Sequence, residues 1–186
     1  MSPPMLRWQI QIILMTLLGC GGSALSRAQL VLPNFSPANP IKVLCVGDSI
    51  TDDCYVSGAW RRPLQPLLSA HNFPYTTLGR VTSPAAAGFT EREHEGYCGA
   101  VIAAPGQGGN VNGYPGAQLY LQKILADALT NATPDVVLLL IGANDIGRGR
   151  NPRFVATNDM ANLVAMIFSN VPNASVLLAK IATLQD

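Results

Sequence analysis

Charged side chains are scarce in this sequence. Asp, Glu, Lys and Arg together make up 12% of the 186 residues, about half the fraction that is usual in soluble domains. Twelve basic residues against eleven acidic ones give a net charge of +1, so no overall field attracts nucleic acid or an anionic membrane surface. This composition excludes an acidic disordered tail, a basic nucleic-acid-binding domain and a coiled coil. The length suits one domain rather than two.

The N-terminal region has no apolar run long enough to cross a membrane, which takes about 20 residues. Its longest run, Ile10–Leu18, is short and mostly apolar, as in the hydrophobic region of a signal peptide. Small residues follow, and Ser26-Arg27-Ala28 offers a cleavage site. We therefore predict a signal peptide at residues 1–28, a linker at 29–40 and a secreted or extracytoplasmic protein. An uncleaved signal anchor, or lipid attachment at Cys20, remains an open alternative.

Cysteine and histidine are both rare. Of the three cysteines beyond the predicted cleavage site, Cys45 lies in an apolar run and is predicted to be a buried thiol. Cys54 and Cys98 both lie in expected loops and form the candidate disulfide of an exported protein, although the sequence leaves their pairing open. The two histidines, His71 and His94, do not combine with these cysteines at metal-ligand spacing. No metal or other cofactor is expected.

Expected strands and helices alternate along the rest of the chain. Buried strands are predicted from short apolar runs, and helices from apolar residues at helical spacing. The strands are expected at Ile41–Val46, Tyr75–Val81, Val136–Ile141 and Val176–Ala182, the helices at Gly58–His71, Ala117–Thr130 and Arg153–Asn170, and one long glycine-rich loop at Ser83–Gly116. This order predicts an α/β domain with a parallel sheet and right-handed crossovers. Ligands of such sheets bind at the carboxyl ends of the strands.

Two of these strand ends carry polar turns. Gly47-Asp48-Ser49 follows the first strand and Gly142-Ala143-Asn144-Asp145 follows the third. Alone, each has an ordinary structural interpretation, because Ser49 or Asp48 can cap a helix and Asn144 can occupy a left-handed turn position. Together they place a hydroxyl nucleophile and an amide donor at neighbouring strand ends. Acyl transfer needs both groups.

These two turns resemble the first and third sequence blocks of the SGNH (GDSL-type) hydrolase family, and Gly99 resembles the glycine of the second block. The resemblance implies a flavodoxin-like three-layer sandwich with a central parallel sheet. It also implies that Ser49 is the nucleophile and that Gly99 and Asn144 form the oxyanion hole. Gly96 is the alternative second-block glycine. Asp48 and Asp145 are expected to support the two turns rather than to react.

Further residues resemble the carbohydrate esterase branch that removes acetyl groups from xylan. They are Trp60-Arg61 and His94-Glu95-Gly96. The resemblance implies a small-molecule or polysaccharide ester as substrate and places His94, Trp60 and Arg61 on the pocket wall. A solvated loop position and a substitute catalytic base are the alternative interpretations of His94.

The family's Asp-x-x-His block, which carries the general base, has no counterpart in this sequence. The resemblance therefore predicts a domain spanning 41–186 that is truncated at its C-terminus. We expect little or no esterase activity from it, because a serine hydroxyl without a base is a poor nucleophile. A non-catalytic carbohydrate-binding or interaction domain derived from the same fold is the alternative function.

Overall fold

The computed structural model describes residues 32–52, 54, 57–102 and 120–179, together with two short strands nearer the N-terminus. These strands, β1 (Gln11–Ile12) and β2 (Ala28–Gln29), pair with each other in antiparallel orientation. Most of the expected signal peptide lies outside the described residues, so its cleavage stays a prediction. No helix within the described ranges has the length and apolar character needed to cross a membrane.

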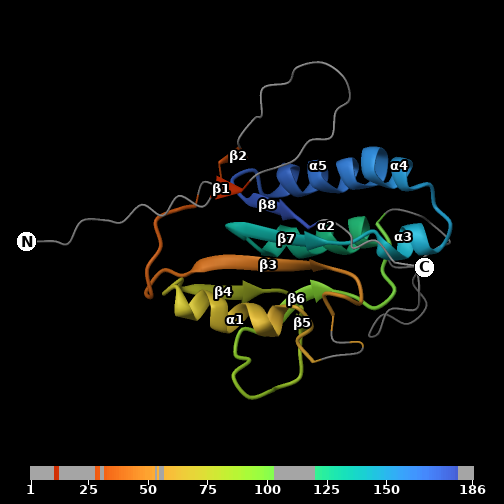
Figure 1. The fold of residues 1–186 in the computed structure, drawn as a ribbon. Helices are drawn as coiled ribbons and strands as arrows, with labels where there is room; N and C mark the ends of the chain where they lie inside the picture. The colour runs from red at the N-terminus through yellow and green to blue at the C-terminus, as the bar shows by residue number, and fades with distance from the viewer. Residues whose placement is uncertain are drawn as a thin grey trace, which may run out of the picture.

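A mainly parallel sheet forms the centre of the molecule (Figure 1). Its strands are β3 (Ile41–Gly47), β4 (Tyr75–Leu78), β5 (Val81–Thr82), β6 (Glu93–Gly96), β7 (Val136–Leu140) and β8 (Ser175–Leu178). The order is β5-β6-β3-β7-β8, and β4 lies beside the first half of β3. Only the β5–β6 pair within this sheet is antiparallel. The predicted α/β fold with a parallel central sheet is confirmed.

Helices cover both faces of the sheet because side chains of the central strand β3 alternate between two apolar clusters. Leu44 and Val46 belong to the cluster of α2 (Leu121–Asn131) and α5 (Met160–Asn170). Val43 and Cys45 belong to a smaller cluster on the face of α1 (Arg61–Ala70). Cys45 is 2% exposed, and its burial raises the pKa of the thiol to about 12, as suits the predicted buried thiol.

Strand β6 was not expected, because it lies inside the predicted loop Ser83–Gly116. Its sequence is polar, so no apolar pattern marks it, and specific tertiary partners hold its buried side chains instead. The carboxylate of Glu95 accepts hydrogen bonds from Arg80 Nη2 at 3.0 Å and from the Tyr97 hydroxyl at 2.6 Å. Residues 103–119 of the predicted loop lie outside the described residues.

Other boundaries also differ from the sequence prediction. The expected strand at 75–81 divides into β4 and β5, because Gly79 adopts a φ of +151° between them. A short helix, α3 (Ala143–Gly147), follows β7 where a turn was expected. The last predicted helix begins as α4 (Pro152–Phe154), continues through a π-helical segment at Val155–Asp159 and ends as α5.

On the α1 face, an apolar groove remains over β7 and β8. Its lining includes Trp60, Leu67, Leu138, Leu140, Leu177 and Leu178. Leu67 is 61% exposed and Leu178 45% exposed, and no helix of the described part of the chain packs over them. The last expected strand, Val176–Ala182, is observed as β8, and residues 180–186 lie outside the described residues.

Candidate active site

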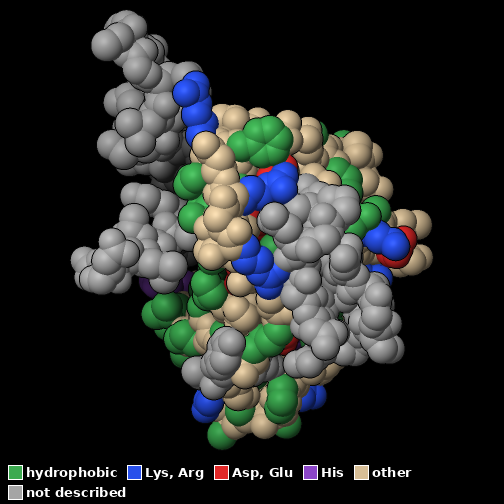
Figure 2. Space-filling view, turned by 90° about the vertical axis from the view of Figure 1, so that its right-hand side faces the viewer, with side chains coloured by type: hydrophobic (Ala, Val, Ile, Leu, Met, Phe, Trp, Pro, Cys, Tyr) green, Lys and Arg blue, Asp and Glu red, His purple; other side chains and the backbone are tan. Residues whose placement is uncertain are grey.

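The strands β3, β6 and β7 point their carboxyl ends to the same side of the molecule (Figure 1). Figure 2 looks onto that side, where several Lys or Arg side chains are visible and acidic ones are few. Residues from the three predicted blocks follow these three strand ends. The sheet therefore gathers at one edge the segments that the sequence analysis singled out.

The turn after β3 carries Ser49. The carbonyl oxygen of Asp48 accepts hydrogen bonds from the backbone N–H groups of Thr51 and Asp52, at 3.0 and 2.9 Å. Its carboxylate Oδ1 accepts another from the Ile50 N–H at 2.9 Å. These bonds close a tight turn around Ser49, whose side chain is half-buried. Asp48 thus shapes the turn through its carbonyl oxygen and its carboxylate.

Gly47 lets this turn lie directly against the neighbouring strand. A Cβ atom at this position would overlap the backbone carbonyl oxygen of Leu140 and the hydroxyl of Thr51. Gly47 pairs with Leu140 on β7 and with Gly96 on β6. Only glycine at position 47 allows this close packing without a shift of the backbone.

Trp60 and Arg61 hold the same turn. The Trp60 indole N–H donates to the Thr51 hydroxyl at 3.3 Å, and Arg61 Nε donates to the Thr51 carbonyl oxygen at 2.9 Å. Arg61 is only 3% exposed and also donates from Nη2 to the hydroxyl of Ser83 at 2.6 Å. Arg61, predicted on a pocket wall, lines an apolar cavity between α1 and β3 and supports the Ser49 turn from inside the fold. Trp60 is half-buried and lines the apolar groove over β7 and β8.

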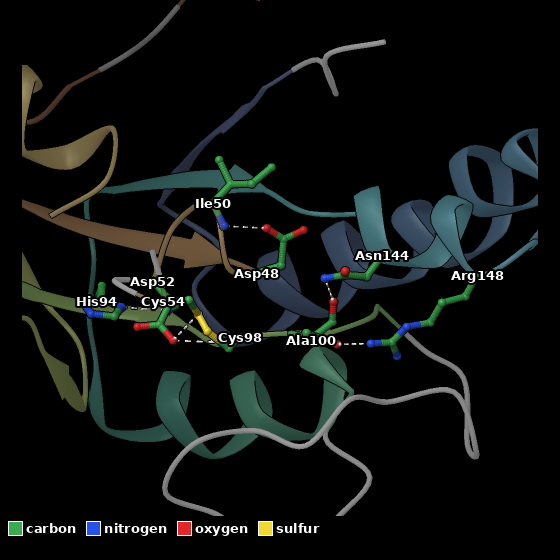
Figure 3. The surroundings of a disulfide bond; sticks show 11 residues. Asp48, Ile50, Asp52, Cys54, His94, Cys98, Ala100, Asn144 and Arg148 are labelled. Atoms are coloured by element: carbon green, nitrogen blue, oxygen red, sulfur yellow. Dashed lines mark hydrogen bonds between the residues drawn. A yellow bond between two sulfur atoms is a disulfide. The ribbon is translucent and has the colours of Figure 1, made fainter. Parts of the chain in front are cut away.

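His94 is also an interior residue. It is fully buried in β6, and its Nδ1 accepts a hydrogen bond from the Gly96 N–H at 3.0 Å. In Figure 3 it lies away from Asn144, on the opposite side of the Cys54–Cys98 disulfide. The structure therefore corrects the prediction that His94 lines a pocket wall, and it does not place His94 in a solvated loop.

The second-block loop, residues 97–102, is held against α3 (Figure 3). Asn144 Nδ2 donates to the Ala100 carbonyl oxygen at 3.0 Å, and Arg148 Nη2 donates to the Gly99 carbonyl oxygen at 3.1 Å. The buried carboxylate of Asp145 accepts the Ile102 N–H at 3.1 and 3.2 Å. The Gly99 block and the Asn144 block are therefore in direct contact, and Asp145 supports that contact.

A disulfide between Cys54 and Cys98 ties this loop to the segment that follows the Ser49 turn, with 6.0 Å between the Cα atoms. The predicted pairing is thus present. Asp52 adds a hydrogen bond that the sequence analysis did not foresee, because its Oδ2 accepts the Cys98 N–H at 3.0 Å. Asp52, Cys54 and Cys98 bring together atoms of the types that ligate metal ions. Both sulfur atoms are bonded to each other in the disulfide, so neither is a thiolate that could bind a metal.

In the described part of the chain, the N–H groups of Ser49, Gly99 and the Asn144 side chain are candidate donors to a bound oxygen. Within the described part of the chain, no acceptor takes the backbone N–H of Ser49 or of Gly99. The amide of Asn144 has two hydrogens, of which Ala100 takes one. The N–H of Gly96, the alternative second-block glycine, is already used by His94. The hydrogen bonding therefore favours Gly99 over Gly96 as the second-block donor.

Two buried carboxyl groups lie near this site. Burial raises the pKa of Asp48 above its ordinary value, and the nearby charge of Asp145 adds to the effect. Burial likewise raises the pKa of Asp145, against the hydrogen bond from the Ile102 N–H. In both cases the neutral acid is favoured relative to a solvated carboxyl. A neutral carboxyl repels an anion developing on a substrate less than a carboxylate would.

The chain matches the GDSL-like lipase/acylhydrolase family over residues 45–185, and it belongs to this family. The match includes Ser49, Gly99 and Asn144. The family consists of serine ester hydrolases, which agrees with a hydroxyl-bearing turn beside unused N–H donors.

Solved structures with the same fold include carbohydrate esterases. A family 3 carbohydrate esterase of Clostridium thermocellum is 26% identical, with a TM-score of 0.59, over 75% of this chain and 60% of that one. A family 3 carbohydrate esterase of Talaromyces cellulolyticus and an acetyl esterase mutant with an acetate ion each show 19% identity and a TM-score of 0.54. Each match covers 74% of this chain and 60% of the other. The chain thus spans about 60% of the length of these structures. No curated protein sequence matches it.

Proposed function

We propose that this chain is a secreted serine esterase domain that removes acyl groups, acetyl in particular, from carbohydrate. The observation that carries the proposal is the meeting of three elements at one sheet edge: the Ser49 turn, the Gly99 loop and Asn144. Between them they present a serine hydroxyl and three N–H groups that lack an acceptor among the described residues. This combination of nucleophile and donors is what acyl transfer requires.

The roles follow from the donor positions. The Oγ of Ser49 attacks the ester carbonyl carbon, and the carbonyl oxygen becomes an anion. The N–H groups of Ser49 and Gly99 and the second amide hydrogen of Asn144 bind that anion. Donors of this kind are each worth about 10²–10³ in rate. A base from solution, water or added imidazole, takes the proton of Ser49 Oγ and returns it to the sugar oxygen, so the sugar leaves as an alcohol. The acyl group stays on Ser49 as an ester, and water then hydrolyses this ester to the free acid and restores the serine hydroxyl.

The substrate class and the location are inferred from similar structures, from sequence motifs and from the N-terminal region. Carbohydrate is favoured by the likeness to the Clostridium thermocellum esterase and by the Trp60-Arg61 and His94-Glu95-Gly96 segments that resemble the acetylxylan branch. The acetate-bound neighbour has this fold and suggests acetyl as the acyl group. Secretion is supported by the apolar N-terminal run and by the disulfide, since disulfides persist in oxidising compartments.

No general base is identified beside Ser49 among the described residues. No Asp-x-x-His motif is present. His94 is buried, and His71 caps the end of α1 opposite to Arg61, about 15 Å along a ten-residue helix. We therefore propose that the chain alone hydrolyses esters slowly. The same observation keeps a non-catalytic carbohydrate-binding domain as the second candidate.

Chemical rescue distinguishes the two candidates. We would measure p-nitrophenol release from p-nitrophenyl acetate with and without imidazole as an external base, and subtract the reaction of imidazole alone. The esterase proposal predicts imidazole-stimulated release well above a Ser49→Ala variant, with an acetyl group on the peptide that carries Ser49 in the mass spectrum. Equal rates for the two proteins would overturn it. Calorimetric binding of xylo-oligosaccharide by such an unreactive protein would then favour the binding domain.

A further inference from the structure

The loops that carry Ser49 and Gly99 leave strands that pair only briefly. β3 and β6 share two residue pairs, Val46 with Glu95 and Gly47 with Gly96. In the described residues, the last backbone bond between the two segments runs from the Tyr97 N–H to the Gly47 carbonyl oxygen at 3.1 Å. Beyond that bond, the sheet ladder does not hold the Gly99 loop against the Ser49 turn.

The Cys54–Cys98 disulfide spans this gap. Cys54 follows Ser49 in the nucleophile loop, and Cys98 directly precedes Gly99. The N–H of Gly99 belongs to the planar peptide group that begins at the Cys98 Cα. Anchoring Cys98 therefore restricts where that N–H can point. Gly99 itself has a φ of +73°, a conformation in which glycine has wide freedom, so the restriction has to come from its neighbours.

The other contacts of the loop act mostly from the opposite side. Asn144 on α3 and Arg148 directly after it donate to the carbonyl oxygens of Ala100 and Gly99, respectively. On the side of the nucleophile turn, the hydrogen bond from the Cys98 N–H to Asp52 accompanies the disulfide. Among the described residues, that hydrogen bond is the direct contact that would still join Cys98 to the turn that carries Ser49 without the covalent link.

We propose that the Cys54–Cys98 disulfide is a positioning element that holds the Gly99 N–H at the oxyanion site of Ser49. The site is then fully formed only under oxidising conditions. A dithiol such as dithiothreitol breaks the S–S bond by transferring two electrons and two protons. The products are two protein thiols and a cyclic disulfide of the reductant. Reduction leaves each N–H donor of the oxyanion site chemically unchanged and alters only its position. The catalytic part of this proposal rests on the proposed function.

The first test compares acetylation rates. Wild-type chain, oxidised or reduced, and the Cys54→Ser/Cys98→Ser double variant would react with p-nitrophenyl acetate and imidazole at a temperature where near-ultraviolet circular dichroism shows all three folded. Misplacing a donor by about 1 Å costs about 10²-fold in rate. We expect that loss in the maximal rate of Ser49 acetylation, with an unchanged half-saturating concentration and recovery after reoxidation. Cys45→Ala keeps the disulfide and should show the same sensitivity to dithiothreitol as wild type.

The second test does not need esterase activity. The ¹⁵N relaxation of the Gly99 amide reports its order parameter, which is about 0.85 for rigid backbone and below about 0.6 for flexible backbone. We expect the first value in the oxidised chain and the second after reduction. This measurement on reduced wild-type chain also serves if the double variant fails to fold.

The outcomes separate the two proposals. If Gly99 loses order on reduction while oxidised chain shows no acetylation that depends on Ser49, the esterase proposal fails and the positioning proposal stands. If acetylation is present and neither its rate nor the order of Gly99 changes on reduction, the positioning proposal is overturned and the esterase proposal stands.

Discussion

Asn144 donates one hydrogen of its side-chain amide to the backbone carbonyl oxygen of Ala100, with 3.0 Å between the two heavy atoms. This bond orients the amide so that its nitrogen faces the second-block loop. It also leaves the other amide hydrogen available to a substrate. One side chain thereby links the loop after β6 to the helix after β7. The same bond presents a donor at the edge of the sheet.

Replacing Asn144 by alanine should remove that donor. We expect the rate of Ser49 acetylation in the presence of imidazole to fall by about 10²–10³-fold, as for other oxyanion-hole side chains. Asn170→Ala, at the exposed end of α5, is the matched control and should leave the rate unchanged. An Asn144→Ala variant as fast as the control would remove Asn144 from the oxyanion hole.

Asp48→Asn should change how stability depends on pH. Because folding raises the pKa of Asp48, its contribution to stability is full below the unfolded pKa of 3.8 and is lost as pH rises through the folded pKa. Asparagine does not titrate. Between pH 4 and pH 7, wild type should therefore lose stability relative to the variant, by about 1.4 kcal/mol for each pH unit by which the pKa is raised. Urea unfolding of both proteins at several pH values measures this difference, and parallel profiles would contradict it.

Gly47→Ala should be severely destabilising. Its Cβ would overlap the carbonyl oxygen of Leu140 and the side chain of Thr51, so β3 and β7 could not keep their register. Overpacking of this kind costs about 1–3 kcal/mol or more. Gly147→Ala is the control, because a Cβ there meets no atom within 4 Å and φ is not left-handed. Thermal unfolding of both variants tests the contrast, which similar midpoints would refute.

Arg61→Lys should weaken the support beneath the nucleophile turn. Lysine lacks the planar fork that reaches both the Thr51 carbonyl oxygen and the Ser83 hydroxyl. Leaving buried acceptors without donors costs about 1–3 kcal/mol. We expect that loss of unfolding free energy together with slower Ser49 acetylation. Arg62→Lys on the exposed face of the same helix should change neither quantity, and equal effects of the two substitutions would show that the buried contacts do not matter.

The Cys54–Cys98 disulfide should also stabilise the fold as a whole. It closes a loop with a sequence separation of 44 residues. Loop-closure entropy predicts a stabilisation of about 4 kcal/mol for that length. Guanidinium unfolding of the Cys54→Ser/Cys98→Ser variant should reveal a loss of this size. A difference below about 1 kcal/mol would be at odds with a closed loop in the unfolded state.

Much of the fold could be predicted from local patterns. The nearly continuous apolar runs at β3 and β7 identify interior strands, because a strand covered on both faces buries side chains of both orientations. The polar β6 could not be predicted in this way. Its buried Glu95 is held by Arg80 and Tyr97, whose contribution depends on contacts that hydropathy does not report. The short helix α3 was missed because Gly142-Ala143-Asn144-Asp145 also suits a turn.

The candidate site shows the same division. Ser49, Gly99 and Asn144 could be identified as candidates because each lies in a short, local sequence motif. His94 is buried rather than on a pocket wall, and Arg61 supports the Ser49 turn, because a polar residue near a motif can face a ligand or hold the backbone from inside. The burial of the side chain decides which of these two roles a residue has, and burial depends on the whole fold.

The sequence by itself determined that this is an α/β domain, that its polar turns follow two apolar strands, and that it holds no Asp-x-x-His motif. Only the tertiary structure decided which N–H groups have no acceptor among the described residues, that Cys54 and Cys98 meet, and that the buried Arg61 donates to the Thr51 carbonyl oxygen. The physical reason is the distance along the sequence between the residues that interact. Strand patterns come from neighbouring residues, whereas a disulfide and a buried arginine depend on segments that the fold brings together from tens of residues apart.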